Sequence, residues 1–309
     1  MSKKHPIVAV TGSSGAGTTT VRRAFNDIFR REGINAAFVA GDGFLRYDRK
    51  TMAQLIAQAH EQGRTLSHFG PEVNLFDELE SLFEDYAHSG VGRVRQYVTE
   101  DNFLELQQPE GTFTPWSVLP ADTDLLFYEG LHGGVVARNW TRREMSPSHN
   151  PAVKERRADV GGKGVDVAQH VDLLLGVVPV VNLEWIQKIH RDTRTRGYSV
   201  EAATDAILRR MRDYVHFLVP QFSITDINFQ RVPVVDTSNP FISRDVPTAS
   251  ESVVVIRFRE PYRFNFPDLL SKIDGSHMSR PNTMVIPGGY MGHALEVICG
   301  PLIHQLCEP

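Results

Sequence analysis

The chain has 309 residues, enough to bury the apolar core of one large α/β domain or of two small ones. Its 33 basic and 37 acidic side chains give a formal charge of −4, so its composition provides no general attraction to nucleic acid or to an anionic membrane. Its two cysteines, Cys299 and Cys307, cannot form a disulfide framework or a close-set thiolate metal site, and they fit a reducing cytoplasm.

The first predicted element is a strand at residues 7–10, directly after a short basic tip. This apolar run is too short for the core of a signal peptide, and no run in the sequence approaches the length that spans a bilayer. A glycine cluster follows, and Val21, Phe25, Ile28 and Phe29 then fall on one face of a helix. The order is therefore strand, glycine-rich loop, helix.

The glycine-rich loop has the spacing of a Walker A phosphate-binding motif. Its backbone N–H groups and the start of the following helix suit the phosphates of ATP, although a simple Gly/Ser turn remains the alternative. Thr18 stands where the motif usually carries a lysine, so another cation must replace that charge, whereas Thr19 keeps the hydroxyl that ligates magnesium. The predicted ATP-binding residues of the loop are Gly12, Ser13, Ser14, Gly15, Ala16, Gly17, Thr18 and Thr19.

Two carboxylates follow predicted strands. A strand at residues 36–40 leads into Gly-Asp-Gly, which leaves Asp42 at the carboxyl edge where open α/β sheets bind ligands. A continuously apolar strand at residues 125–128 ends at Glu129. Asp42 fits a base that accepts a proton from a sugar hydroxyl, with a turn aspartate as the alternative. Glu129 fits a magnesium ligand, with a helix-start carboxylate as the alternative.

The remaining pattern alternates helices and strands. It predicts helices at residues 51–61, 71–87, 183–196, 200–217 and 292–306, and strands at 171–181, 231–235 and 253–259. Residues 138–164 are rich in Arg, Lys, Gly and Pro and predict a surface insert in one domain that spans residues 1–309. The alternation indicates a P-loop NTPase-like α/β fold, with a mixed, mainly parallel sheet flanked by helices.

Charge is concentrated in the second half of the helix at 183–196. Lys188, Arg191, Asp192 and Arg196 resemble the mobile lid of small-molecule kinases, which closes cations over the transferring phosphoryl group. A solvated helix face is the alternative. Lys188 is the candidate for the cation that the loop lacks.

Several segments together resemble the bacterial phosphoribulokinases. They are the P-loop with threonine in place of lysine and the strings that begin at Tyr128 (YEGLHG), Asn182 (NLEWIQK) and Asn228 (NFQRVP). The resemblance covers almost the whole chain outside the insert. It implies that MgATP phosphorylates ribulose 5-phosphate to the 1,5-bisphosphate, the step that supplies the carbon dioxide acceptor of the Calvin cycle.

The resemblance also implies roles for single residues. The catalytic set comprises a base, two cations that stabilise phosphoryl charge, and a carboxylate that serves the transferring group: Asp42, Lys188, Arg191 and Asp192. The magnesium ligands are Thr19, Glu129 and Asp192. The sugar phosphate is bound by Arg31, Arg49, Tyr97 and His132, and Arg196 serves ATP or the neighbourhood of the sugar phosphate.

Regulation and assembly are implied by the same resemblance. Bacterial members are homo-oligomers, commonly octamers, that NADH activates and AMP inhibits, and Arg257 falls where the family has an arginine implicated in that switch. An arginine within an apolar strand needs an anionic or carbonyl partner, so a buried pair and an anion site are both consistent with Arg257. Ala16 stands where plant-type enzymes carry a regulatory cysteine, so that redox control is not expected.

Two positions depart from the family pattern. Leu45 stands in place of the histidine of Asp-x-Phe-His-Arg, and Thr99 stands where relatives often have a histidine after Tyr-x. Both histidines of the family are associated with the sugar phosphate, and replacing such a donor by leucine removes a hydrogen bond worth about 1 kcal/mol. The alternatives are therefore a uridine-kinase-like or other pentose or nucleoside kinase, and a nucleotide-binding regulatory protein without turnover.

Overall fold

A mixed sheet of eight strands forms the centre of the molecule, in the order β2-β5-β1-β6-β7-β8-β10-β9. The computed structural model describes residues 5–12, 18–135 and 165–308. The parallel strands are β2 (Ala36–Ala40), β5 (Leu125–Gly130), β1 (Ile7–Gly12), β6 (Leu173–Pro179) and β7 (Ile227–Pro233). The antiparallel extension consists of β8 (Ser252–Phe258), β10 (Thr283–Pro287) and β9 (His277–Arg280). The predicted fold class, a mainly parallel P-loop kinase sheet, is confirmed.

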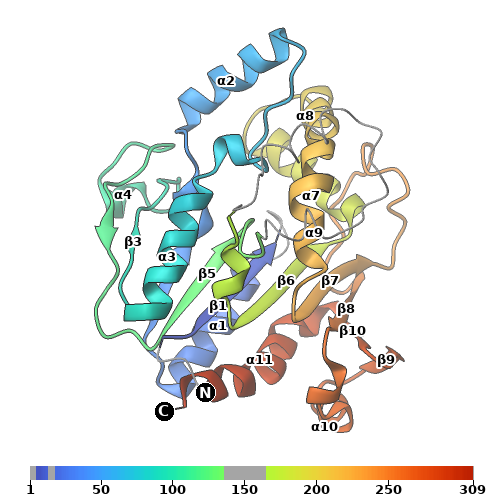
Figure 1. Cartoon of the computed structure of the whole chain (residues 1–309). Coiled ribbons are helices and arrows are strands. Elements are labelled where there is room, and N and C mark those ends of the chain that lie inside the picture. The colour runs from blue at the N-terminus through green and yellow to red at the C-terminus, as the bar shows by residue number, and fades with distance from the viewer. Residues whose placement is uncertain (1–4, 13–17, 136–164, 309) are drawn as a thin grey trace, which may run out of the picture.

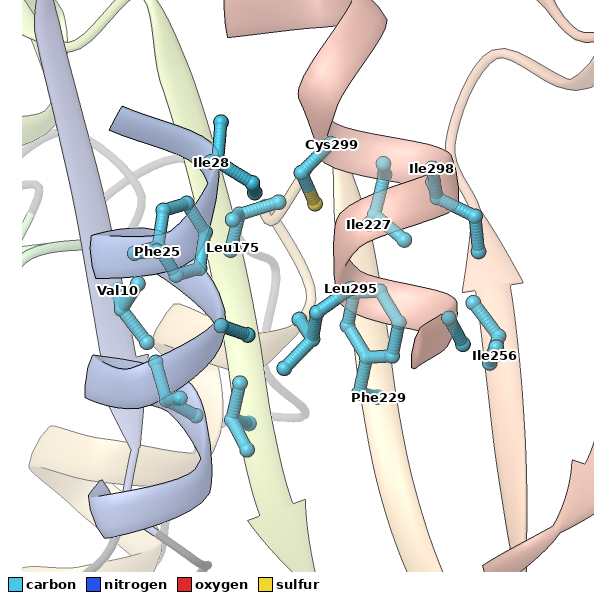
Figure 2. Close-up of a cluster of buried hydrophobic side chains, with 14 of the residues drawn as sticks. Val10, Phe25, Ile28, Leu175, Ile227, Phe229, Ile256, Leu295, Ile298 and Cys299 are labelled. Atoms are coloured by element: carbon cyan, nitrogen blue, oxygen red, sulfur yellow. The ribbon is translucent and has the colours of Figure 1, made fainter. Parts of the chain in front are cut away.

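Helices cover both faces of this sheet (Figure 1). On one face, α1 (Thr18–Glu32) and α11 (Met291–Cys307) pack over β1, β6, β7 and β8, and Figure 2 shows Phe25 and Ile28 of α1 beside Leu295 and Cys299 of α11. These α1 residues are buried, as their helical spacing predicts. On the other face, α3 (Phe76–Ser89) contributes its apolar stripe to a second core that includes Tyr128 of β5.

Three helices gather at the end of the molecule that is opposite to the two chain termini (Figure 1). They are α2 (Arg49–Glu61), α7 (Val181–Arg194) and α8 (Val200–Asp213). A π-helical turn at residues 214–218 joins α8 to the short α9 (Val219–Phe222), with the Val219 N–H bonded to the Tyr214 carbonyl. Pro220 lacks an N–H and its ring would clash with the His216 carbonyl in a regular helix, which explains the wider turn.

The smaller elements include the 3₁₀ turn η1 (Gly41–Phe44) after β2, the paired strands β3 (Arg93–Val94) and β4 (Ser117–Val118), and the short helices α4 (Phe103–Leu106) and α10 (Phe266–Lys272). Further 3₁₀ turns are η2 (Pro71–Val73), η3 (Val167–His170), η5 (Pro261–Arg263) and η6 (Gly288–Tyr290). None of the described helices has the length and apolar character needed to cross a membrane.

Several predicted boundaries are wrong. The helix expected at 71–87 is a 3₁₀ turn followed by α3, because the Asn74 side chain bonds the carbonyls of His68 and Gly70 and holds the chain extended there. β7 begins at Ile227 instead of residue 231, and β6 ends before Val181, where α7 begins. The hairpin β9–β10 and helix α10 were not predicted, since β9 is largely polar and exposed. The insert at 138–164 lies outside the described residues.

Candidate active site

The two strand-end carboxylates, Asp42 and Glu129, lie together at the carboxyl edge of the sheet. β2 pairs with β5 so that Ala40 lies opposite Glu129, and η1 begins at the next residue. Gly41 permits this close approach, because a Cβ atom there would lie 2.9 Å from the Cα of Gly130. Asp42 is therefore near enough to act on the charge of Glu129. The sequence predicted both residues at this edge, and the structure brings them together.

The electrostatic surroundings of this pair disfavour two negative charges. Burial raises the pKa of Glu129 to about 7, with Arg22 of α1 opposing the shift and Asp42 adding to it. Asp42 is open to solvent but closely surrounded by protein, and the resulting desolvation raises its pKa as well. Within the described part of the chain, neither carboxylate forms a salt bridge. Such a pair stabilises a bound cation or an incoming proton.

A magnesium ion is compatible with this donor set. The described residues contain no cluster of three or more His, Cys, Asp or Glu side chains that could hold a metal by themselves. Magnesium in kinases is usually held by one or two carboxylates together with substrate phosphates, so Glu129, which lies opposite Val10 of β1, is compatible with a role as a ligand. Thr19 lies in the first turn of α1, at the end of that helix nearest to β1.

The phosphate loop itself is seen only at its two ends. Gly12 ends β1, and an added Cβ there would clash with the Val177 carbonyl of neighbouring β6, so glycine is required at this position. Thr18 and Thr19 open α1. The predicted ATP-binding residues Ser13, Ser14, Gly15, Ala16 and Gly17 lie outside the described residues.

The charged residues of α7 form one compact cluster. Asp192 is 4% exposed and accepts hydrogen bonds from Lys188, from Arg191 Nε at 3.4 Å and from Arg196 Nη1 at 3.1 Å. Burial raises the pKa of Asp192, but these three cations more than offset that effect and hold its pKa below the usual range. Burial lowers the pKa of Lys188. With its carboxylate occupied by three cations, Asp192 is better suited to orienting them than to binding the predicted magnesium ion.

Two members of this cluster were missed by sequence reasoning, Arg210 and His68. Arg210 of α8 acts on the charges of Asp192 and Lys188, and it continues the buried stripe of Ala203 and Ile207 at helical spacing. That spacing was a readable signal for an inward-facing arginine. Burial, together with the charges of Arg210, Lys188 and Arg196, lowers the pKa of His68 to about 4. No local pattern marked His68.

A second arginine site lies beside the Asp42 turn. Arg49 starts α2, donates to Glu110 Oε1 at 2.7 Å, and has its pKa raised by hydrogen bonds to Tyr97 and Glu110. Arg95 joins the Tyr97 segment to the turn, because its Nε donates to the Gly43 carbonyl at 2.8 Å. The structure thus places Arg49 and Tyr97, both predicted to bind substrate, in the same corner as Asp42.

Three other predicted residues do not join this site. Arg31 lies at the far end of α1, about 20 Å along the helix from its start, and pairs there with Glu296 of α11 at 3.3 Å. His132 is 5% exposed and packs against the Phe76 ring, so the protein interior surrounds it. Arg257 of β8 donates to the Phe222 carbonyl at 2.9 Å, which supplies the carbonyl partner that one interpretation required.

Comparisons with known proteins agree with this geometry. Residues 7–238 match the model of the Phosphoribulokinase / Uridine kinase family. The chain is 52% identical over 309 residues to "Phosphoribulokinase" of Sinorhizobium medicae and 54% identical over 311 residues to the plasmid-borne "Phosphoribulokinase" of Cupriavidus necator, covering all of this chain and 98% of each relative. The solved structure of the phosphoribulokinase from Rhodobacter spheroides superposes with a TM-score of 0.85 at 50% identity, covering 99% of this chain and 98% of that one. The chain therefore belongs to the phosphoribulokinase and uridine kinase family.

Proposed function

We propose that this chain is a phosphoribulokinase, which transfers the γ-phosphoryl group of ATP to the free primary hydroxyl of D-ribulose 5-phosphate. The observation that carries the proposal is the pair Asp42 and Glu129 at the carboxyl edge of the sheet. Glu129 is in β5, the strand next to β1, which leads into the phosphate loop, and Asp42 follows β2 on the other side of β5. The full-length similarity to proteins named phosphoribulokinase supports ribulose 5-phosphate as the acceptor.

Asp42 is proposed as the base. The acceptor hydroxyl loses its proton as the new P–O bond forms, and a carboxylate on a turn at the cleft can accept that proton. The raised pKa of Asp42 brings its basicity closer to that of a group that works at neutral pH. The product alcohol oxygen is then part of a phosphate ester, and the bond to ADP is broken.

The remaining roles follow from charge and position. When bound, magnesium would neutralise charge on the ATP phosphates, with Glu129 and Thr19 as its proposed protein ligands. Lys188, Arg191 and Arg196 are proposed to stabilise the negative charge of the transferring phosphoryl group, since Asp192 bonds all three at the end of α7. Lys188 thereby replaces the lysine that the phosphate loop lacks. Arg49 and Tyr97 are proposed to bind the phosphate of the sugar.

The family membership also supports finer proposals. We propose that the protein is a homo-oligomer, that NADH activates it and that it functions in carbon dioxide fixation. The resemblance of its sequence to the bacterial phosphoribulokinases implies these three properties. Arg257 has a role in the switch only if the Phe222 carbonyl is exchanged for another partner, because that carbonyl already accepts its hydrogen bond. Enzyme kinetics measure the activation by NADH, and light scattering measures the number of subunits.

A coupled ADP-release assay tests the proposed reaction. Ribulose 5-phosphate, ribose 5-phosphate and uridine are compared at equal concentration with MgATP, in the presence and absence of NADH. We expect turnover with ribulose 5-phosphate to exceed that with the other two acceptors by at least a hundredfold. Preferred turnover of uridine, which the family name also allows, would replace this proposal with a nucleoside kinase. Absence of ADP release with every acceptor would indicate a binding protein.

A further inference from the structure

The amide of Gln221, in α9, uses all of its hydrogen-bonding capacity in the protein interior. The residue is 1% exposed. Its Oε1 accepts from Thr11 Oγ1 at 3.2 Å and from the Gly134 N–H at 3.0 Å, while its Nε2 donates to the Phe217 carbonyl at 2.8 Å and to His132 Nδ1 at 3.3 Å. A glutamine amide has two donors and two main acceptor positions, so no capacity is left over.

These partners come from three segments that the proposed reaction needs. Thr11 is the residue before Gly12, at the end of the strand that leads into the phosphate loop. Gly134 belongs to the loop after β5, the strand that ends with Glu129 and Gly130, and Thr11 Oγ1 also bonds Leu131 of that loop at 3.0 Å. Phe217 lies in the π turn that follows α8, the helix that carries Arg210. Gln221 is the side chain that joins the three.

The orientation of the amide determines which nitrogen of His132 carries the proton. The Gly134 N–H must face an oxygen and the Phe217 carbonyl must face a nitrogen, so the backbone fixes the amide in one orientation. Because Gln221 Nε2 is a donor, His132 Nδ1 must be the acceptor, and the ring proton is on Nε2. That Nε2 faces the His68 carbonyl at 3.5 Å. The His68 ring in turn lies near Lys188, Arg196 and Arg210.

We propose that Gln221 is a positioning residue for phosphoryl transfer, which holds the end of β1 and the Glu129 loop in register with the π turn and fixes His132 as its Nε2–H tautomer. Gln221 contacts neither substrate in this arrangement, because its side chain is buried in the protein interior. The role of the residue in catalysis rests on the proposed kinase function, whereas the hydrogen-bond arrangement does not.

The principal test is Gln221→Glu, which keeps the size of the side chain and replaces the Nε2 donor with an acceptor oxygen. The substitution also leaves the Phe217 carbonyl without a donor, and the ionised carboxylate favours a proton on His132 Nδ1. We expect ¹⁵N NMR of the full-length protein without substrates to show the Nε2–H tautomer of His132 in the wild type and a protonated Nδ1 in the variant. With MgATP, calorimetry should show binding weakened three- to tenfold, and kcat should fall at least tenfold with KM for the sugar phosphate changed by less than twofold.

A matched control is Thr225→Val, which removes one buried hydrogen bond just after the same helix, from Thr225 Oγ1 to the Phe222 carbonyl at 2.9 Å, without touching Gln221. We expect it to lower Tm while MgATP binding and kcat stay as in the wild type. If Gln221→Glu does not fold, Thr11→Val removes the Thr11 hydroxyl from both Gln221 Oε1 and the Leu131 carbonyl and should weaken MgATP binding in the same direction.

The outcomes separate the two proposals. Wild-type MgATP affinity in both Gln221→Glu and Thr11→Val, or an unchanged His132 tautomer in Gln221→Glu, would overturn the positioning role. The positioning role would also be overturned if Thr225→Val and Gln221→Glu lowered Tm equally and weakened MgATP binding equally. Gln221 would then act only through the stability of the fold. A wild-type protein that phosphorylates no sugar refutes the proposed function alone, because the tautomer and MgATP measurements do not depend on an acceptor.

Discussion

The carboxylate of Asp192 on α7 differs from those of Asp42 and Glu129 at the carboxyl edge of the sheet in how its charge is balanced. Asp192 is buried, yet three cations of its own chain bond it and hold its pKa below the usual range. Asp42 and Glu129 lack such partners among the described residues, and desolvation by the surrounding protein raises the pKa of both. The pKa values of carboxylates are therefore shifted in opposite directions on α7 and at the carboxyl edge of the sheet.

This difference separates a structural role from a chemical one. A carboxylate that its own protein has neutralised can orient the groups around it, but it has little tendency to take a proton or a metal ion. A carboxylate that burial has destabilised gains free energy when a proton or a magnesium ion arrives. On this basis we expect Asp192 to organise the cations around it, and we propose Asp42 for the exchange of the proton and Glu129 for the exchange of the metal ion.

The largest effect should come from Asp42→Asn. The amide keeps the size of the side chain but cannot accept the proton, and general base catalysis contributes about a hundred- to ten-thousandfold. We therefore expect kcat to fall by that range while the Kd for MgATP changes by less than threefold, because the base acts mainly in the transition state. A wild-type kcat in this variant would show that Asp42 is not the base. The difference in charge balance between Asp42 and Asp192 would then have no consequence for catalysis.

The Asp192 cluster is tested by Lys188→Met. Loss of this cation should lower kcat about a hundredfold, since charge that stabilises a transferring phosphoryl group acts at a site from which water is excluded. Lys272→Met is the matched control, because Lys272 forms the same i,i+4 pair with Asp268 at 2.7 Å, on the exposed helix α10. Exposed pairs contribute about 0–1 kcal/mol, so this variant should keep wild-type kcat. Equal losses in the two variants would contradict the assignment.

Glu129→Gln should have a smaller effect that depends on pH. Glu129 has a pKa of about 7 in the fold, raised from its ordinary value near 4.5, so the stability that its protonated form provides is complete below about pH 4.5 and is lost as pH rises through 7. Without magnesium and nucleotide, the variant should match the wild type in unfolding free energy at pH 4.5 and exceed it by about 2–3 kcal/mol at pH 8. Urea unfolding at the two pH values measures this difference.

The same variant should lose the pH dependence of magnesium binding. In the wild type, protons compete with magnesium for Glu129, so the magnesium requirement should increase as pH falls below 7. Glu129→Gln should need more magnesium at every pH and show no such increase. A wild-type magnesium requirement that is constant between pH 6 and 8 would show that Glu129 is already ionised, as Asp192 is.

The sequence predicted this edge of the molecule well because its signals are local. A strand that ends in Gly41 and Asp42, and an apolar strand that ends at Glu129, each place a carboxylate without information from the rest of the chain. The sequence likewise predicted a helix with Lys188 and Asp192 in the charged cluster of its second half. The fold class followed from the alternation of these elements.

What the sequence did not predict depends on contacts between distant segments. His132 is near Glu129 in sequence, but its side chain lies in the interior, where it bonds Gln221, which is 89 residues away. Arg31 is an exposed arginine on a helix whose start is at the site, and only the length of α1 shows that its end is remote. The polar β9 forms a strand because β10 pairs with it, a long-range effect that local propensity does not contain.

The smallest effect concerns the acceptor corner beside Asp42. Arg49→Ala should raise KM for ribulose 5-phosphate about tenfold with kcat reduced less than threefold, because the guanidinium binds a phosphate that does not react. Arg64→Ala is the control, since the Arg64 guanidinium bonds only its near neighbour Gln62 among the described residues and its loss should leave KM unchanged. If Arg49→Ala lowers kcat as strongly as Lys188→Met does, Arg49 acts on the transferring group, and the cations of the site cannot be divided between acceptor and phosphoryl group as proposed.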